Sequence, residues 1–150
     1  MKKIALLTLT CALAFAPLAI AQAASDMDHS QMQGTTDTSP SQAMEAITVN
    51  LERMHQDLQD MRDPGQRSTA FGTLNKHMMA MHHGMQAVEQ HAEKTDNTAV
   101  QQLMDRLNKE MMVTMKHMGQ LKSDPDTAIG KVEQGLLTME KTVNAMKNTN

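Results

Sequence analysis

Methionine and histidine side chains crowd one segment of the chain, residues 77–85. The segment His77-Met78-Met79-Ala80-Met81-His82-His83-Gly84-Met85 has four methionines and three histidines among nine residues. Thioether sulfur is a soft ligand that selects Cu(I), and imidazole binds copper in either oxidation state, so these residues are candidate donors for a copper site. Methionine also fills hydrophobic cores, and packing alone is the competing interpretation of this pattern.

The same segment belongs to a longer apolar pattern. Apolar residues repeat at steps of three and four, the period of an amphipathic helix with one buried face. They are Phe71, Leu74, Met78, Met81, Met85, Val88 and Ala92. His77 and His82 flank this seam, whereas Met79 and His83 point away from it. The pattern therefore predicts soft donors both inside the protein and on the outer surface of one helix.

The first 23 residues have the pattern of a secretory signal peptide. Lys2 and Lys3 precede an apolar run over residues 4–20, which is followed by the A-x-A site Ala21-Gln22-Ala23. We expect cleavage after Ala23, with Ala19-Ile20-Ala21 as the nearby alternative. No later segment is apolar enough to span a bilayer. The sequence thus predicts export to a bacterial periplasm, with no membrane insertion after cleavage of the signal peptide.

Composition restricts the chemistry of the exported chain. Its single cysteine, Cys11, lies inside the expected signal peptide, so neither a disulfide nor a thiolate metal site is expected. The net charge is −3 with histidine neutral, and loss of Lys2 and Lys3 makes the chain more acidic, which disfavours nucleic acid and anionic membranes as partners. Tyrosine and tryptophan are absent, so stacking on nucleobases is not expected.

Helix-capping signals divide residues 39–150 into four amphipathic segments. Ser39-Pro40 with Gln42 has the spacing of a capping box, and Asp63-Pro64-Gly65 ends the first helix. Ser123-Asp124-Pro125 stops the third helix and caps the fourth. Four such helices joined by short turns predict an all-α domain, an antiparallel up-down-up-down four-helix bundle.

The second and third helices are less sharply bounded. We expect the second from about Arg67 to Lys94, and a third that is capped by Thr95 or Asp96. Met115 is assigned to the buried seam of the third helix. Met79 and Met112 lie off their seams, where a charged residue or glutamine would favour solubility. Exposed methionine there indicates either a solvent-facing metal site or a partner surface.

The helix midpoints of an antiparallel bundle share one level, and this arrangement groups the candidate ligands. A central group consists of Met54, His55, Met78, Met81, His82, Met85, Glu110, Met111 and Met139, with Leu107 and Leu136 beside them. A second group towards one end consists of Met61, His77, Met115, His117 and Met118. For these methionines the alternative is core packing, and for His55, His77 and His117 it is a solvated helix flank.

Residues 24–38 form a polar tail without apolar periodicity, expected to be disordered without a ligand. The tail contains Met27-Asp28-His29-Ser30-Gln31-Met32-Gln33-Gly34, which resembles the Met/His octapeptide repeated in periplasmic copper-resistance proteins, including multicopper oxidases. A flexible M-x-H-x-x-M segment can wrap the side chains of Met27, His29 and Met32 around one Cu(I) ion. A chance match of a short polar tail is the alternative.

The body of the chain, from about Met44 to Leu121, resembles an exported bacterial family called domain of unknown function three-hundred-and-five. The likeness is carried by Arg53-Met54-His55, Phe71, Met79-x-x-His82-His83, Asp96-Asn97-x-x-Val100 and Glu110-Met111. The resemblance implies a ferritin-like helical bundle that, as in some members, binds copper or silver in the periplasm.

Individual roles also follow from this resemblance. The family's paired histidines map onto His82 and His83, its preceding methionine onto Met79, and its Glu-apolar pair onto Glu110 and Met111. The chain departs from the family at Met81, where proline is usual, and at Glu89 and Thr114, where methionine is usual.

These observations predict a periplasmic metal-binding protein rather than an enzyme. The expected cargo is Cu(I), with Ag(I) as a second ion, held as a buffer or chaperone alongside other copper-resistance proteins. The alternative is a periplasmic stress or folding chaperone with a Met-rich client surface. A di-iron enzyme is disfavoured because, of the two Glu-x-x-His pairs it requires, only Glu52-x-x-His55 fits.

Overall fold

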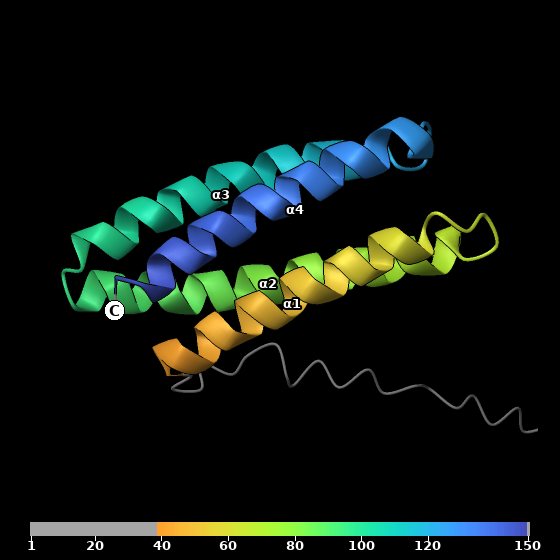
Figure 1. The fold of residues 1–150 in the computed structure, drawn as a ribbon. Helices are drawn as coiled ribbons and strands as arrows, with labels where there is room; N and C mark the ends of the chain where they lie inside the picture. The colour runs from red at the N-terminus through yellow and green to blue at the C-terminus, as the bar shows by residue number, and fades with distance from the viewer. Residues whose placement is uncertain (1–38, 150) are drawn as a thin grey trace, which may run out of the picture. The chain divides into compact units, whose positions relative to one another are not determined.

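The computed structural model describes residues 39–149, which fold into four α-helices. They are α1 (Pro40–Asp60), α2 (Arg67–Lys94), α3 (Thr98–Met118) and α4 (Pro125–Lys147). Helices that follow each other in the chain pack side by side and α4 packs on α1, whereas the diagonal pairs are not in close backbone contact (Figure 1). The predicted all-α four-helix bundle is confirmed. The expected signal peptide and tail lie outside the described residues.

Local capping explains where α1 and α4 begin. The Gln42 N–H donates to Ser39 Oγ at 3.3 Å and the Ser39 N–H to Gln42 Oε1 at 3.1 Å, which is the predicted capping box. The Thr127 N–H donates to Asp124 Oδ1 at 3.3 Å, with Pro125 at the first helical position. Both starts are thus determined within a few residues of sequence.

The start of α3 differs from the sequence prediction. Asn97 is the N-cap, and its Oδ1 accepts from the Val100 N–H at 3.2 Å. Asp96 has φ of 50°, in the left-handed region, whereas an N-cap residue is normally in the β region. Asp96 therefore turns the chain between the helices, and Thr95 ends α2.

The turn between α1 and α2 is organised by one carboxylate. The Gly65 N–H donates to Asp63 Oδ1 at 2.9 Å and the Gln66 side-chain amide to Oδ2 at 3.1 Å. These two hydrogen bonds to the charged form hold the pKa of Asp63 below its usual value. Since Asp63 is fully exposed, this is a local feature of the turn.

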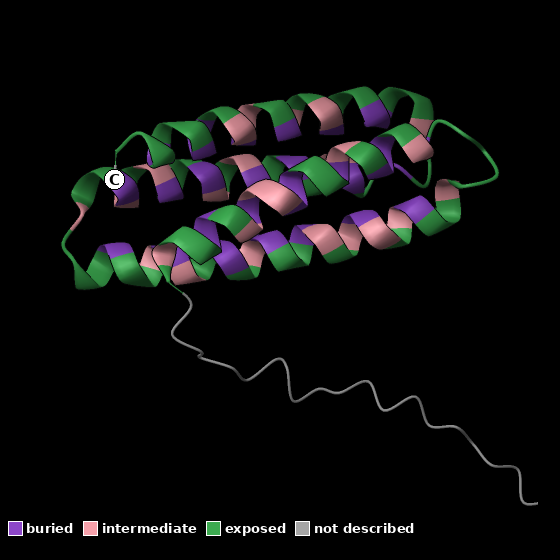
Figure 2. Ribbon diagram, turned by 60° about the horizontal axis from the view of Figure 1, so that its bottom comes forward, coloured by how far each residue is buried: buried purple, intermediate pink, exposed green. Residues whose placement is uncertain are grey.

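Methionine supplies much of the hydrophobic core. The buried methionines are Met44, Met54, Met61, Met78, Met81, Met85, Met104, Met111, Met118, Met139 and Met146. Figure 2 shows buried residues on the inner faces of the helices. No helix in the described part of the chain is long and apolar enough to cross a membrane. Core packing therefore accounts for most, but not all, of the methionine content.

Three methionines of residues 39–149 stay outside the core. Met79 is 57% exposed and Met112 66%, as their off-seam positions predict. Met115 is 49% exposed, which corrects its assignment to the seam. The reason is that the neighbouring Thr114, fully buried, occupies the core position of that turn of α3 and leaves Met115 on the flank.

A close approach of α3 and α4 at Gly135 gives a test of the packing. A Cβ atom at Gly135 would overlap the Thr114 side chain, whereas one at Gly130 would meet no atom within 4 Å. We expect Gly135→Ala to lower the free energy of unfolding by about 1–3 kcal/mol, because the core is overpacked there. Gly130→Ala, the matched control, should raise it by up to about 1 kcal/mol through helix propensity. Urea denaturation followed by circular dichroism measures both, and equal effects would contradict the close approach.

Candidate metal-binding site

Two contacts define how α2 lies against α3. Near the α2–α3 turn, Gln101 Nε2 donates to the Ala92 carbonyl at 3.0 Å. Near the other end, Lys122 Nζ, in the turn after α3, lies 4.9 Å from the centre of the Phe71 ring. Because the helices are antiparallel, these two contacts determine which residues between them face each other.

His82 and Met111 lie at the same level of this helix pair. Along the sequence, His82 is about midway between Phe71 and Ala92. Met111 is about midway between their contact partners, Gln101 and Lys122. α2 and α3 also pack less extensively than the other neighbouring pairs. The middle of the α2–α3 pair thus contains an imidazole at the level of Met111.

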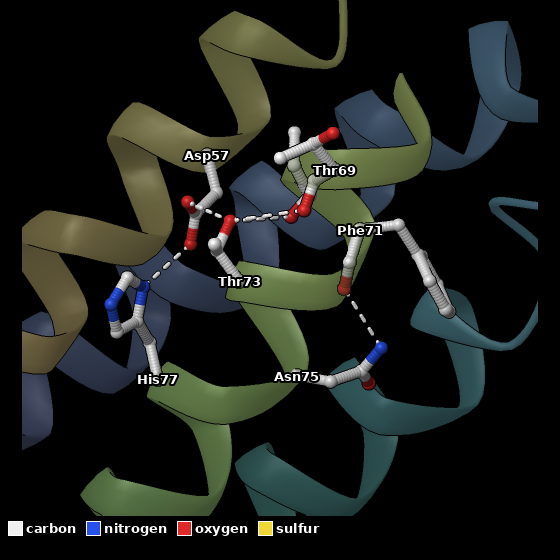
Figure 3. A network of polar contacts seen from close by, with 7 residues as sticks. Asp57, Thr69, Phe71, Thr73, Asn75 and His77 are labelled. Carbon is white, nitrogen blue, oxygen red and sulfur yellow. Dashed lines mark hydrogen bonds and ion pairs between the residues drawn. The ribbon is translucent and has the colours of Figure 1, made fainter. Parts of the chain in front are cut away.

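The α3-facing flank of α2 carries His82. Phe71, Asn75, Met78 and His82 follow each other at steps of four, three and four and share one face of the helix. Figure 3 shows Phe71 and Asn75 pointing to the opposite side of α2 from His77, which faces α1. Since Phe71 contacts Lys122, this flank is the one directed at α3.

The facing flank of α3 carries two exposed thioethers. Gln101, Asn108, Met112 and Met115 follow each other at steps of seven, four and three and share the face that contacts α2 through Gln101. Met112 is next to Met111, and Met115 is one turn further along. Both therefore lie within about one helical turn of the level of His82, since a turn has about 3.6 residues.

The imidazole of His82 has an unsatisfied nitrogen. Its Nδ1 atom is buried and has no hydrogen-bond partner, while its Nε2 lies 3.3 Å from Gln86 Nε2. The His83 ring is tilted by 41° at a centroid distance of 6.3 Å, and His83 is exposed. A buried polar atom without a partner costs about 1–3 kcal/mol, so its position calls for an explanation.

Two other half-buried histidines are paired with carboxylates on α1 or α4. His77 Nδ1 lies 2.7 Å from Asp57 Oδ2. Thr73 Oγ1 donates to the other oxygen of Asp57 at 2.6 Å (Figure 3). His55 Nε2 lies 3.1 Å from Glu140 Oε1, close enough for an ion pair but not aligned as a hydrogen bond. His55 and His77 therefore link helices and are not solvated flank residues.

The second predicted ligand group is not brought together. His77 faces α1, whereas His117 lies 3.4 Å from Gln120 Oε1 and lines an open groove between α3 and α4. Met61 and Met118 are buried in the core, and Met115 lies on the α2-facing flank. In residues 39–149 no three His, Cys, Asp or Glu side chains group closely enough to hold a metal ion.

The central group is divided between the core and the α2–α3 flank. Met54, Met81, Met85, Met111 and Met139 are buried in the common core. Glu110 is engaged by Arg106 Nε and Thr142 Oγ1, each at 2.8 Å, and so faces α4 rather than His82. His83 lies on the outer face of α2, and Met79 lies one helical turn before His82 at the exposed edge of its flank.

The α2–α3 flank thus offers one imidazole and three thioethers. They are His82, the buried Met78, and the exposed Met112 and Met115. We name this set the His82 cluster. Met112 is in neither of the two predicted ligand groups, although its spacing from Met115 places both on one helical face. The candidate tail ligands Met27, His29 and Met32 lie outside the described residues.

The chain matches no protein-family model, no curated protein and no solved structure.

Proposed function

We propose that the chain is a periplasmic copper-binding protein that holds Cu(I), or Ag(I), as a buffer or chaperone in copper resistance. The observation that carries this proposal is the buried, unpartnered Nδ1 of His82, and helix register puts the exposed Met112 and Met115 of α3 near its level. An apolar side chain would pack there without the desolvation cost. A soft metal ion gives the nitrogen a partner and gives the exposed thioethers a role.

One tautomer of His82 has a lone pair on Nδ1 that can bind a metal ion. The side-chain amide of Gln86 lies beside Nε2 and can present either its nitrogen or its oxygen there. With the oxygen turned to the ring, Nε2–H donates to it and the lone pair is on Nδ1. Gln86 then orients the imidazole, as outer-shell partners of ligating histidines commonly do.

The donors match a soft, monovalent ion. Thioether and imidazole groups select Cu(I), and the cluster has no carboxylate that would favour a harder ion. Met115 and Met112 are on the surface, so an ion can reach them without opening the core. The compartment follows from the signal-peptide pattern, and the tail motif supplies a second set of the same donors in Met27, His29 and Met32.

The proposal is tested by titrating Cu(I) into the chain from residue 24 in competition with a chromophoric chelator. We expect binding to persist in a chain that also lacks residues 24–38, since the His82 cluster is in the bundle. Met112→Leu with Met115→Leu should then weaken it at least about 10-fold, because even outer-shell changes cost 10–100-fold. Val113→Ala, similarly exposed on α3 but lining the groove between α3 and α4, is the control. Binding that disappears with the tail would place the site there instead.

A second candidate function is a folding chaperone with an adaptable apolar surface. The specific observation is that Met112, Val113 and Met115 are 66%, 56% and 49% exposed on one helix. Methionine-rich surfaces adapt to varied partners. Two results together would establish this function in place of copper binding. Metal-free protein would suppress client aggregation, and neither the chain with residues 24–38 nor the chain without them would bind Cu(I).

A further inference from the structure

The exposed methionines differ sharply from the others in their access to solvent. Met79, Met112 and Met115 are 57%, 66% and 49% exposed, whereas the eleven buried methionines are at most 6% exposed. Oxidation of methionine depends on access of the oxidant to sulfur. The fold therefore divides its described methionines into three reactive and eleven protected ones.

Oxidation at these positions has a defined chemistry. Hydrogen peroxide transfers one oxygen atom to the thioether: the O–O bond breaks, an S=O bond forms, water leaves, and sulfur is oxidised while peroxide is reduced. The product is a polar sulfoxide, which methionine sulfoxide reductases convert back to the thioether. Its added oxygen is a hard donor, so a soft ion loses the ligand it prefers.

We propose that Met112 and Met115 are a reversible oxidation site, and that their conversion to sulfoxides switches off soft-metal binding by the His82 cluster. The modification follows from exposure alone, whereas its effect on binding rests on the proposed function. Both residues lie on the α2-facing flank of α3 near the level of His82. Met79 has similar exposure and lies one helical turn before His82 on α2, so the test below separates its contribution from that of Met112 and Met115.

The fold tolerates this modification. A sulfoxide at Met112 or Met115 projects into water, and no polar group has to be buried. A sulfoxide at a buried position such as Met139 would instead introduce an unpaired polar atom into the core, which is destabilising. Oxidation at the surface thus changes the ligands while the bundle remains folded.

The test uses the metal-free chain from residue 24 with Met27→Leu and Met32→Leu, so that tail thioethers do not contribute. After mild peroxide treatment, peptide mass mapping should find added oxygen at Met79, Met112 and Met115 well before the eleven buried methionines. Circular dichroism should be unchanged, and Cu(I) affinity should fall at least about 10-fold, as for loss of a ligand. Treatment with both methionine sulfoxide reductases and a thiol reductant should restore it, and adding Met79→Leu should not alter the loss.

The outcomes separate the two proposals. Oxidation spread evenly over core methionines, or loss of helicity at the same rate, would overturn the selective site. Selective oxidation with unchanged Cu(I) affinity would overturn the switch alone. If untreated protein binds no Cu(I), the switch and the proposed function both fail, and the mapping still decides whether Met112 and Met115 are the modified residues.

Discussion

Replacing His82 by leucine is expected to make the metal-free protein more stable and, at the same time, to weaken its binding of Cu(I). The buried Nδ1 atom has no hydrogen-bond partner, and removing such a group relieves about 1–3 kcal/mol of desolvation cost, less any loss of packing. We therefore expect the free energy of unfolding to rise by about 1 kcal/mol. The Cu(I) affinity should fall at least about 10-fold, because a direct donor is lost.

Urea denaturation and chelator competition on the same preparations measure these two effects. His77→Leu is the matched control, because that imidazole is hydrogen-bonded to the buried Asp57 carboxylate at 2.7 Å. Its loss should lower stability and leave Cu(I) affinity unchanged. If His82→Leu instead destabilises the protein and does not change the affinity, His82 is a packing residue and the cluster is not the site.

Replacing Met139 by alanine is expected to change the free energy of unfolding more than replacing His82 by leucine does. Met139 is fully buried in the common core, and truncation of a buried methionine to alanine costs about 2–5 kcal/mol through lost contacts and a cavity. Met139→Leu keeps the volume and should cost less than about 1.5 kcal/mol. Urea denaturation distinguishes the two variants, and chelator competition should find the Cu(I) affinity of the leucine variant unchanged.

The comparison with Met115→Leu decides whether buried sulfur is a ligand or a packing group. Met115 is half exposed, so its replacement should change stability by no more than about 0.5 kcal/mol, as for ordinary surface positions. It should nevertheless weaken Cu(I) binding. The reverse result, with affinity lost in Met139→Leu and retained in Met115→Leu, would move the metal site into the core.

Local features of the sequence were sufficient for most of the fold. Ser39, Asp124 and the two prolines that follow them act within one helical turn, so the starts of α1 and α4 could be predicted from neighbouring residues. The three-and-four spacing likewise predicted which methionines are buried along α1, α2 and α4. The cap of α3 was misplaced by one or two residues because the backbone conformation of Asp96 is not evident from its side chain.

The candidate site depended on contacts between distant parts of the chain. The residue types of the His82 cluster are visible in the sequence, and so is the off-seam position of Met112. Helix pairing decides the rest. It leaves Thr114 rather than Met115 in the core, brings carboxylates against His55 and His77, and leaves His82 Nδ1 without a partner. Helical periodicity assigns a residue to a face of its own helix. Which neighbour covers that face, and at what level, is decided only when the four helices pack.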